Sequence, residues 1–198
     1  HDVILNMLEE CRKAGHEDRA LMFCSLSKVT FPGAGVAAMA ASRRNIDYIL
    51  KNMFPMIISF DKLNQVRHIR FLKDMDGLAA HMEKHRALLE PKFRAVLAIL
   101  DEGLSGCGSI ARWTKPNGGY FLSLYTLGGC AKRTVQLCRE AGVVLTDAGA
   151  AYPYGVDPQD SNIRIAPTFP PLDELETASR LLCVCVRIAR LENLLQRQ

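Results

Sequence analysis

The chain has 198 residues, of which 48% are hydrophobic and 23% charged, and its formal net charge is +4. These values are typical of a globular chain of one or two domains, and they exclude a disordered or low-complexity chain. No apolar run approaches the roughly 20 residues that a membrane-spanning helix needs. The basic residues are dispersed rather than clustered, so we expect neither a membrane nor a nucleic-acid partner.

The first part of the chain alternates apolar runs with helical patterns. Apolar residues at helical spacing predict helices over residues 3–13, 43–53 and 62–72. Asp61 stands where it can cap the last of these. Two runs, residues 20–24 and 35–41, are almost wholly apolar and predict buried strands, which we expect to lie centrally in a parallel sheet.

A long helical pattern begins near Met75 and ends near Leu104, with Pro91 inside it. Proline has no amide proton and its ring clashes with the preceding turn, so we expect the helix to bend there. A bent helix is a suitable crossing between two domains. The sequence therefore predicts a crossing between two domains on this helix.

The second half predicts further alternation of strands and helices. Strands are expected at residues 120–125, 143–146 and 163–166, and helices at 131–140 and 172–195. Gly142 is suited to end the first helix, and the Pro170-Pro171 pair to open the second. This alternation places the chain in the α/β or the α+β class.

The sequence predicts no metal site. The seven cysteines are odd in number and irregularly spaced, which favours buried free thiols in a reducing compartment, and we expect a cytoplasmic protein. Cys183 and Cys185 lie two apart in a predicted helix, where their side chains point about 200° apart and cannot grip one ion. His81 and His85 have the spacing of two zinc ligands, but no third ligand is marked, so we interpret them as surface or interface residues.

Lys28 stands at the end of a predicted buried strand, which is unusual because an ammonium group is costly to bury. Burial lowers the pKa of a lysine and makes its amine nucleophilic, as Schiff-base chemistry requires. Hydroxyls of Ser25, Ser27 and Thr30 surround it, and the small residues 33–35 permit close approach of backbone to a ligand. The segment can thus hold a phosphate beside an imine-forming lysine. An ordinary turn with a solvent-facing lysine is the alternative that composition leaves open.

The segment Ser25-Leu26-Ser27-Lys28, followed by a glycine-rich loop, resembles the cofactor-lysine motif of fold-type I pyridoxal-phosphate aminotransferases. Residues 113–121 resemble the turn and strand that open the small domain of these enzymes. Residues 161–165 resemble the segment whose arginine holds the substrate carboxylate. Residues 61–68 and 148–158 are similar to the MocR-like subgroup, some members of which are aspartate aminotransferases.

This resemblance covers nearly the whole chain and implies the C-terminal part of such an enzyme. Residues 1–90 would end the large parallel or mixed-sheet domain that binds pyridoxal 5'-phosphate, and residues 91–198 would form the small α/β domain. The implied reaction moves an amino group between an amino acid, aspartate being the first candidate, and a 2-oxo acid. The family also implies a homodimer.

The resemblance also implies roles for individual residues. Lys28 would hold the cofactor as a Schiff base and later act as the base that moves the substrate's α-proton. Ser25 and Ser27, with Thr30 as a weaker candidate, would bind the cofactor phosphate. Arg164 would grip the substrate α-carboxylate through two parallel hydrogen bonds, a geometry that lysine cannot reproduce.

Two features depart from the family pattern. Many relatives place a phosphate-binding arginine shortly after the lysine, where this chain has Gly35 and Val36. The residues that bind the pyridine ring would precede His1, so we expect the chain to need the upstream half of the large domain. Two alternatives stay open: another fold-type I enzyme such as a carbon–sulfur lyase, or the ligand-sensing domain of a MocR-type transcriptional regulator.

Overall fold

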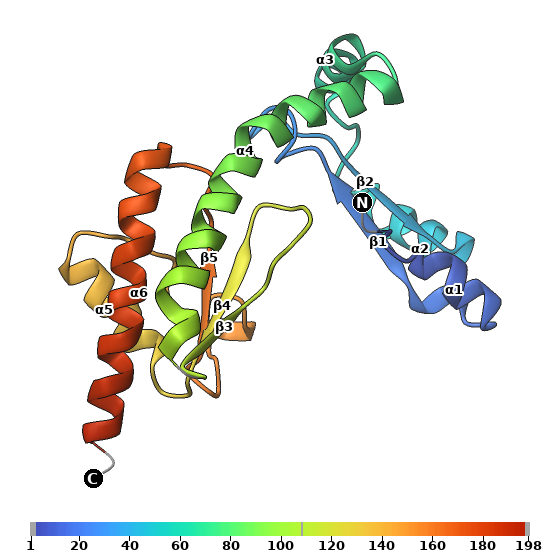
Figure 1. The fold of residues 1–198 in the computed structure, drawn as a ribbon. Helices are drawn as coiled ribbons and strands as arrows, with labels where there is room; N and C mark the ends of the chain where they lie inside the picture. The colour runs from blue at the N-terminus through green and yellow to red at the C-terminus, as the bar shows by residue number, and fades with distance from the viewer. Residues whose placement is uncertain (1–2, 108, 197–198) are drawn as a thin grey trace. The chain divides into compact units, whose positions relative to one another are not determined.

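The computed structural model describes residues 3–107 and 109–196, and the chain divides into two compact units, residues 1–85 and 86–198. The division falls inside helix α4 (Met75–Leu104), on which the sequence predicts the crossing between domains (Figure 1). This helix runs through Pro91 without a break. Whether the units correspond to a cofactor domain and a small domain stays a prediction.

Unit 1 consists of short helices and a two-stranded antiparallel sheet. Its elements before α4 are α1 (Met7–Lys13), the 3₁₀ helix η1 (Glu17–Arg19), β1 (Leu21–Ser25), β2 (Ala37–Ala41), α2 (Arg43–Met53) and α3 (Lys62–Leu72). Three of the helices begin at a capping side chain, which accepts a hydrogen bond from a backbone N–H of the first turn: Asn6 for α1, Ser42 for α2 and Asp61 for α3.

The sequence located these elements well but misjudged the environment of the strands. Helix α1 begins at Met7 rather than at residue 3. The Asn6 side chain accepts a hydrogen bond from the Glu9 backbone amide and so caps the N-terminus of the helix at this point. Strands β1 and β2 pair antiparallel, so the expected parallel pairing is wrong. All of β1 is exposed, with Phe23 72% exposed, because the described elements leave both faces of this sheet largely uncovered.

Unit 2 contains a three-stranded antiparallel sheet in the order β3-β4-β5. Its elements after α4 are the 3₁₀ helix η2 (Ser105–Cys107), β3 (Ala111–Trp113), β4 (Leu122–Thr126), α5 (Ala131–Glu140), the 3₁₀ helix η3 (Pro153–Gly155), β5 (Asn162–Ile165) and α6 (Leu172–Leu195). Helices α5 and α6 have the predicted bounds, and Gly142 follows α5 with a φ of +90°, as a C′ glycine should.

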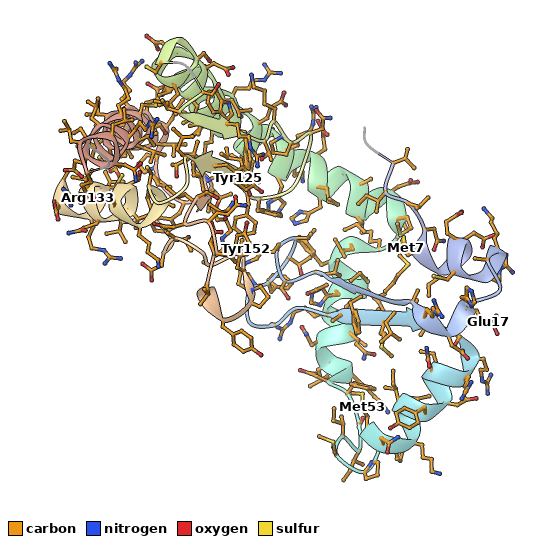
Figure 2. All side chains as sticks on the ribbon, turned by 90° about the horizontal axis from the view of Figure 1, so that it is seen from below. Met7, Glu17, Met53, Tyr125, Arg133 and Tyr152 are labelled. Atoms are coloured by element: carbon orange, nitrogen blue, oxygen red, sulfur yellow. The ribbon has the colours of Figure 1, made fainter. Side chains whose placement is uncertain are left out.

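One face of this sheet forms the core of the molecule. Leu122 and Leu124 of β4 and Ile163 and Ile165 of β5 pack against apolar residues of α4, α5 and α6. Helices α4 and α6 approach closely, since a side-chain carbon at Gly103 would lie 2.8 Å from the Cys183 sulfur. In Figure 2 the side chains around Tyr125 crowd together, whereas those near Met53 in unit 1 project separately.

In the described part of unit 2, one expected strand is absent and one unexpected strand, β3, is present. Residues 143–146 are not a strand: Val143 and Leu145 pack against the core and Val144 is 79% exposed, but none of the described strands pairs with this segment. Strand β3 was not foreseen. Among the described residues, none of the helices combines the length and apolarity that a bilayer crossing needs.

Candidate cofactor and substrate site

Lys28 lies in a hydrogen-bonded turn directly after β1. The backbone amides of Val29 and Thr30 both donate to the Leu26 carbonyl oxygen at 2.9 Å. The Leu26 amide donates to the Val36 carbonyl oxygen, also at 2.9 Å. Lys28 itself is exposed, so the expected burial is wrong for this chain. The reason is that β1, the apolar strand on which that expectation rested, is exposed too.

Ser25 and Ser27 form a pair of hydroxyls immediately before Lys28. Their oxygens are 2.6 Å apart, and the Ser27 amide donates to the Ser25 oxygen at 3.1 Å. Each hydroxyl has one proton, and the contact between them uses one. The other proton can therefore be donated to an anion, so the pair fits the phosphate of a cofactor.

Gly35, one of the small residues in the loop after Lys28, makes room for a contact within the chain. A side-chain carbon at Gly35 would lie 2.7 Å from the Ser27 oxygen and 3.0 Å from the Ser27 Cα and backbone nitrogen. Gly35 thus lets the loop pack directly on Ser27, rather than only on a ligand. A larger side chain at position 35 would therefore require Ser27 to shift.

Thr30 is engaged by a helix far along the chain. Its hydroxyl oxygen lies 2.7 Å from His68 Nε2 and 3.2 Å from the Leu26 carbonyl oxygen. One turn away, the Asn64 side-chain amide donates to the Ala34 carbonyl oxygen at 2.6 Å. Both contacts tie α3 to the loop that contains Lys28.

Sequence reasoning gave no role to His68. Its only local signal is the i, i+4 spacing that puts Asn64 and His68 on one face of α3. Both side chains are buried, and their burial depends on a loop at least 30 residues earlier in the chain. Nothing in the sequence of α3 itself specifies that contact.

Arg164 lies on β5, opposite Ser123 of β4. Its Nε atom is buried and has no hydrogen-bond partner, and its guanidinium carbon stands 4.7 Å from the centre of the Phe121 ring. No carboxylate pairs with it among residues 3–107 and 109–196. A buried donor without a partner is costly, so Arg164 is suited to take a carboxylate from outside the chain.

Asp157 holds the start of β5. Its carboxylate accepts the amide protons of Ser161 at 2.7 Å, Asn162 at 2.8 Å and Gln159 at 3.0 Å. Burial raises the pKa of this carboxyl, but these hydrogen bonds together with the Ser161 hydroxyl lower it by more, so the pKa lies below its usual value. The charged form of Asp157 therefore stabilises the strand on which Arg164 lies.

The histidines with zinc-like spacing are used within the protein. His81 Nε2 lies 2.7 Å from the Val29 carbonyl oxygen and 3.1 Å from His85 Nε2. The described part of the chain contains no group of three or more histidine, cysteine, aspartate or glutamate side chains placed to hold a metal ion.

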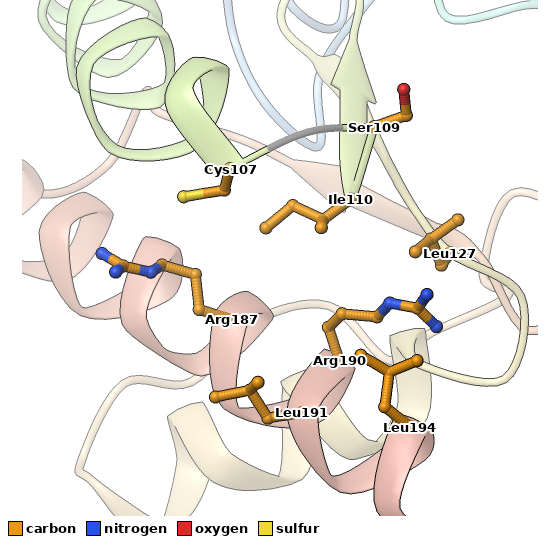
Figure 3. Close-up of a pocket in the computed structure, with 8 residues that line it drawn as sticks. All are labelled: Cys107, Ser109, Ile110, Leu127, Arg187, Arg190, Leu191 and Leu194. Carbon is orange, nitrogen blue, oxygen red and sulfur yellow. The ribbon is translucent and has the colours of Figure 1, made fainter. Parts of the chain in front are cut away.

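Each unit has a surface pocket. One of about 620 Å³ in unit 2 lies between α6 and the start of the sheet, where Arg187 and Arg190 point to opposite sides (Figure 3). It contains none of the predicted site residues. A groove of about 770 Å³ in unit 1 runs along β1, β2 and α2, and Ser25 is part of its wall. The groove in unit 1 is therefore the one associated with the lysine segment.

Comparison with known proteins decides the family. The family described as aspartate amino-transferase matches residues 1–198, the whole chain. The chain belongs to the aspartate amino-transferase family. As the resemblance implied, its fold is part of a fold-type I aminotransferase, and the predicted fold class is confirmed.

Two curated relatives match most of this chain. The chain is 50% identical over 182 residues to a Mycolicibacterium smegmatis protein, covering 92% of this chain and 42% of the relative. It is 43% identical over 180 residues to an aspartate aminotransferase of Corynebacterium glutamicum, and the match covers 91% of this chain and 41% of the relative. The chain thus spans about two fifths of the length of these curated relatives.

Solved structures agree with this assignment of the family. A crystal structure of an aspartate transaminase from Corynebacterium glutamicum superposes with a TM-score of 0.91 at 41% identity, covering 96% of this chain and 44% of that one. An α-aminoadipate aminotransferase from Thermus thermophilus, complexed with N-(5'-phosphopyridoxyl)-L-leucine, has a TM-score of 0.77 at 21% identity. This match covers 96% of the present chain and 48% of the Thermus chain. The second likeness shows the fold.

Proposed function

We propose that the protein carrying this chain is a pyridoxal-phosphate-dependent aminotransferase. It moves an amino group between an amino acid, with aspartate the first candidate, and a 2-oxo acid. The observation that supports this most directly is Lys28, placed in a turn immediately after the Ser25 and Ser27 hydroxyls. The 43% identity to an aspartate aminotransferase supports the substrate, and the phosphopyridoxyl complex of a structural relative supports the cofactor.

Lys28 is the proposed attachment point and base. When bound, the cofactor supplies an electron sink for the bond that breaks at the substrate's α-carbon. Lys28 Nζ would hold the cofactor at its aldehyde carbon and, once free, would act as the base that moves the substrate's α-proton.

The cofactor phosphate is assigned to Ser25 and Ser27. The two hydroxyls leave one proton for a phosphate oxygen, and the cofactor's negative charge must be met in part by groups from elsewhere. Thr30 stays the weaker candidate, because its single proton is already shared between His68 and Leu26.

Arg164 is the proposed group for the substrate α-carboxylate. Its buried, unpartnered Nε and its place over Phe121 leave the guanidinium fork available to a planar anion. Lysine at this position would keep the charge and lose the fork.

We also propose that the full protein is a homodimer of the MocR-like subgroup and works in the cytoplasm. The support is the family resemblance and the free state of all seven cysteines, which suits a reducing compartment. Light scattering of the purified full-length protein tests the dimer: a mass of one chain at micromolar concentration would contradict it.

Borohydride reduction tests the lysine assignment. Reduction of the cofactor-loaded protein, followed by peptide mapping, should place the pyridoxyl label on Lys28. The controls are Lys51 and Lys62 in the same unit, which should stay unlabelled. A label on either of these, with Lys28 clean, would overturn the proposed function of Lys28.

The Arg164→Lys variant tests the carboxylate assignment. It should lower kcat/KM for an amino acid by roughly ten- to a hundredfold, since each 1.36 kcal/mol is a factor of ten and a charged hydrogen bond contributes about 1.5–3 kcal/mol. The matched substrate is the α-amide, which has no carboxylate. If the variant slows both substrates equally, Arg164 has a structural role instead.

Product analysis separates aminotransferase from carbon–sulfur lyase. Aspartate and 2-oxoglutarate should give a second amino acid without release of ammonia. Release of ammonia from a sulfur-containing amino acid, with no transfer to 2-oxoglutarate, would favour the lyase.

A further inference from the structure

The two residues that follow Lys28 are each held by a histidine from a distant helix. The Val29 carbonyl oxygen lies 2.7 Å from Nε2 of His81 on α4, and the Thr30 hydroxyl lies 2.7 Å from Nε2 of His68 on α3. We propose that His68 and His81 are positioning residues that fix the Lys28 turn for catalysis. The inference rests on the proposed function for its catalytic consequence, and on the contacts of unit 1 for its geometry.

The protonation of His68 follows from its partners. Nδ1 lies 2.8 Å from the Asn64 carbonyl oxygen, which can only accept, so Nδ1 carries a proton. In the neutral ring Nε2 is then an acceptor, and the Thr30 hydroxyl donates to it at 2.7 Å while sharing its proton with the Leu26 carbonyl oxygen at 3.2 Å. The Leu26 carbonyl oxygen, the other acceptor near Thr30, already receives two backbone amides. His68 is 4% exposed, so water does not compete strongly for this bond.

His81 is fixed in the complementary way. The Val29 carbonyl oxygen can only accept, so Nε2 of His81 carries the proton and donates it. His85 Nε2, 3.1 Å away, then faces that N–H with its lone pair. The His81 and His85 rings meet edge to face with centroids 4.7 Å apart. His85 thus supports the orientation in which His81 reaches Val29.

A row of aromatic rings links the two histidines. Phe31, the residue after Thr30, packs edge-on against His68 with ring centroids 5.5 Å apart, and its ring is tilted against that of Phe71 at 5.6 Å. Phe71 in turn packs edge-on against His81 at 5.0 Å. Such contacts restrict both imidazole rings. The chain after Lys28 is therefore held at three successive residues, 29 through its carbonyl, 30 through its hydroxyl and 31 through its ring.

These contacts matter because unit 1 has little else to hold the turn. Among its described residues only Ala20, Asn64 and His68 are buried. On the other side of Lys28, Ser27 is held by Ser25 and by the close approach of Gly35. Lys28 is thus placed between two fixed segments. Small misplacement of a catalytic group costs large factors in rate, which gives the histidines their effect on catalysis.

Paired substitutions to glutamine and asparagine test this role. Glutamine places its amide near the position of Nε2, and asparagine places its amide near that of Nδ1. His68→Gln and His81→Gln should therefore keep the contacts to Thr30 and Val29. His68→Asn and His81→Asn should lose them, while His68→Asn keeps a group near the Asn64 carbonyl oxygen.

The first measurement is amide hydrogen exchange over residues 26–36, which needs no activity. We expect exchange to be about tenfold faster in each asparagine variant and within about twofold of wild type in each glutamine variant. The second is steady-state kinetics in the full-length holoenzyme. We expect kcat about tenfold lower in the asparagine variants with KM for the amino acid changed less than about twofold, because Arg164 is untouched.

The results distinguish this proposal from the proposed function. If Lys28 is not labelled by borohydride but the exchange pattern holds, the aminotransferase role fails and the histidine contacts stand as structure alone. If Lys28 is labelled and both asparagine variants exchange and turn over like wild type, the positioning role is overturned. Equal losses in the glutamine and asparagine variants would also overturn it, since the ring rather than the hydrogen bond would then matter.

A second pair covers the case in which a histidine variant does not fold. Thr30→Val keeps the shape of the side chain and loses its hydroxyl, whereas Thr30→Ser keeps the hydroxyl. Faster exchange of residues 26–36 in Thr30→Val, but not in Thr30→Ser, supports the contact with His68. Equal exchange in the two variants contradicts it. Fluorescence of Trp113, the single tryptophan, reports that unit 2 is intact in every variant.

Discussion

The two units of the chain are held together by different forces. Unit 2 buries apolar side chains such as Leu124 and Ile163 completely, on a sheet covered by three helices. In the described part of unit 1 only Ala20, Asn64 and His68 are buried, and two of these are polar. Hydrophobic burial stabilises unit 2, whereas hydrogen bonds and ring contacts define the geometry of unit 1.

This difference bears on how the two proposed site groups are placed. Arg164 lies on a strand whose other face is part of a packed core, so its position follows from the core. Lys28 lies on a turn beside an exposed sheet, and its position follows from a few polar contacts. Large exposed apolar side chains, such as Phe23 and Ile58, are typical of surfaces that contact further polypeptide.

Thiol reactivity should show the largest contrast between the units. Burial, with a smaller contribution from Cys185, raises the pKa of Cys138 to about 12, and burial raises that of Cys183 to about 11. At pH 8 about one Cys138 thiol in ten thousand is then the reactive thiolate. Cys24 on β1 is exposed. Iodoacetamide with peptide mapping should label Cys24 at least a hundredfold faster, and similar rates would show that unit 2 opens readily.

Matched leucine substitutions should sharpen the comparison in stability. Leu124 in unit 2 is 0% exposed, and Leu124→Ala should lower the free energy of unfolding of unit 2 by about 2–5 kcal/mol. Leu63 in unit 1 is 81% exposed, and Leu63→Ala should change stability by less than about 0.5 kcal/mol. Urea unfolding followed by Trp113 fluorescence measures the first, and circular dichroism the second. Equal losses would contradict the difference between the units.

The Asp157→Asn variant probes a polar contribution to unit 2. It keeps one acceptor oxygen and loses the charge, so we expect a loss of about 1.5–3 kcal/mol at pH 7. The folded-state pKa of Asp157 lies below the ordinary value of 3.8, so the stabilisation is fully present above that value and is lost as the pH falls through the folded-state pKa. The difference between wild type and variant should thus be constant from pH 7 to 5 and shrink below about pH 3.8. A difference that grows at low pH would refute the assignment.

A smaller loss than that at Asp157 is expected at Gly35 in unit 1. A methyl group there meets the Ser27 backbone at 3.0 Å, so Gly35→Ala should cost about 1 kcal/mol locally and speed amide exchange of residues 26–36 about fivefold. Gly118→Ala is the matched control, because a methyl group there meets nothing within 4 Å. If both variants exchange alike, the close approach of Gly35 to Ser27 has no role in holding the Lys28 turn.

The sequence by itself determined the features that depend on neighbouring residues. Helices α2, α5 and α6 have their predicted bounds, since helical periodicity, the Ser42 cap, Gly142 and the Pro170-Pro171 pair act within one or two turns. The adjacency of Ser25, Ser27 and Lys28 is equally local, and it carried the family resemblance that the comparisons confirmed.

Only the tertiary structure decided which segments meet. Residues 143–146 have a strand-like apolar run but pair with none of the described strands, whereas β3 is a strand because β4 pairs with it. Lys28 is exposed because the strand before it, β1, is uncovered. His68 is buried because the loop that contains Thr30, 38 residues earlier, contacts it. Sheet hydrogen bonds and burial join residues far apart along the chain, so local patterns state what a segment requires and the fold decides which partner supplies it.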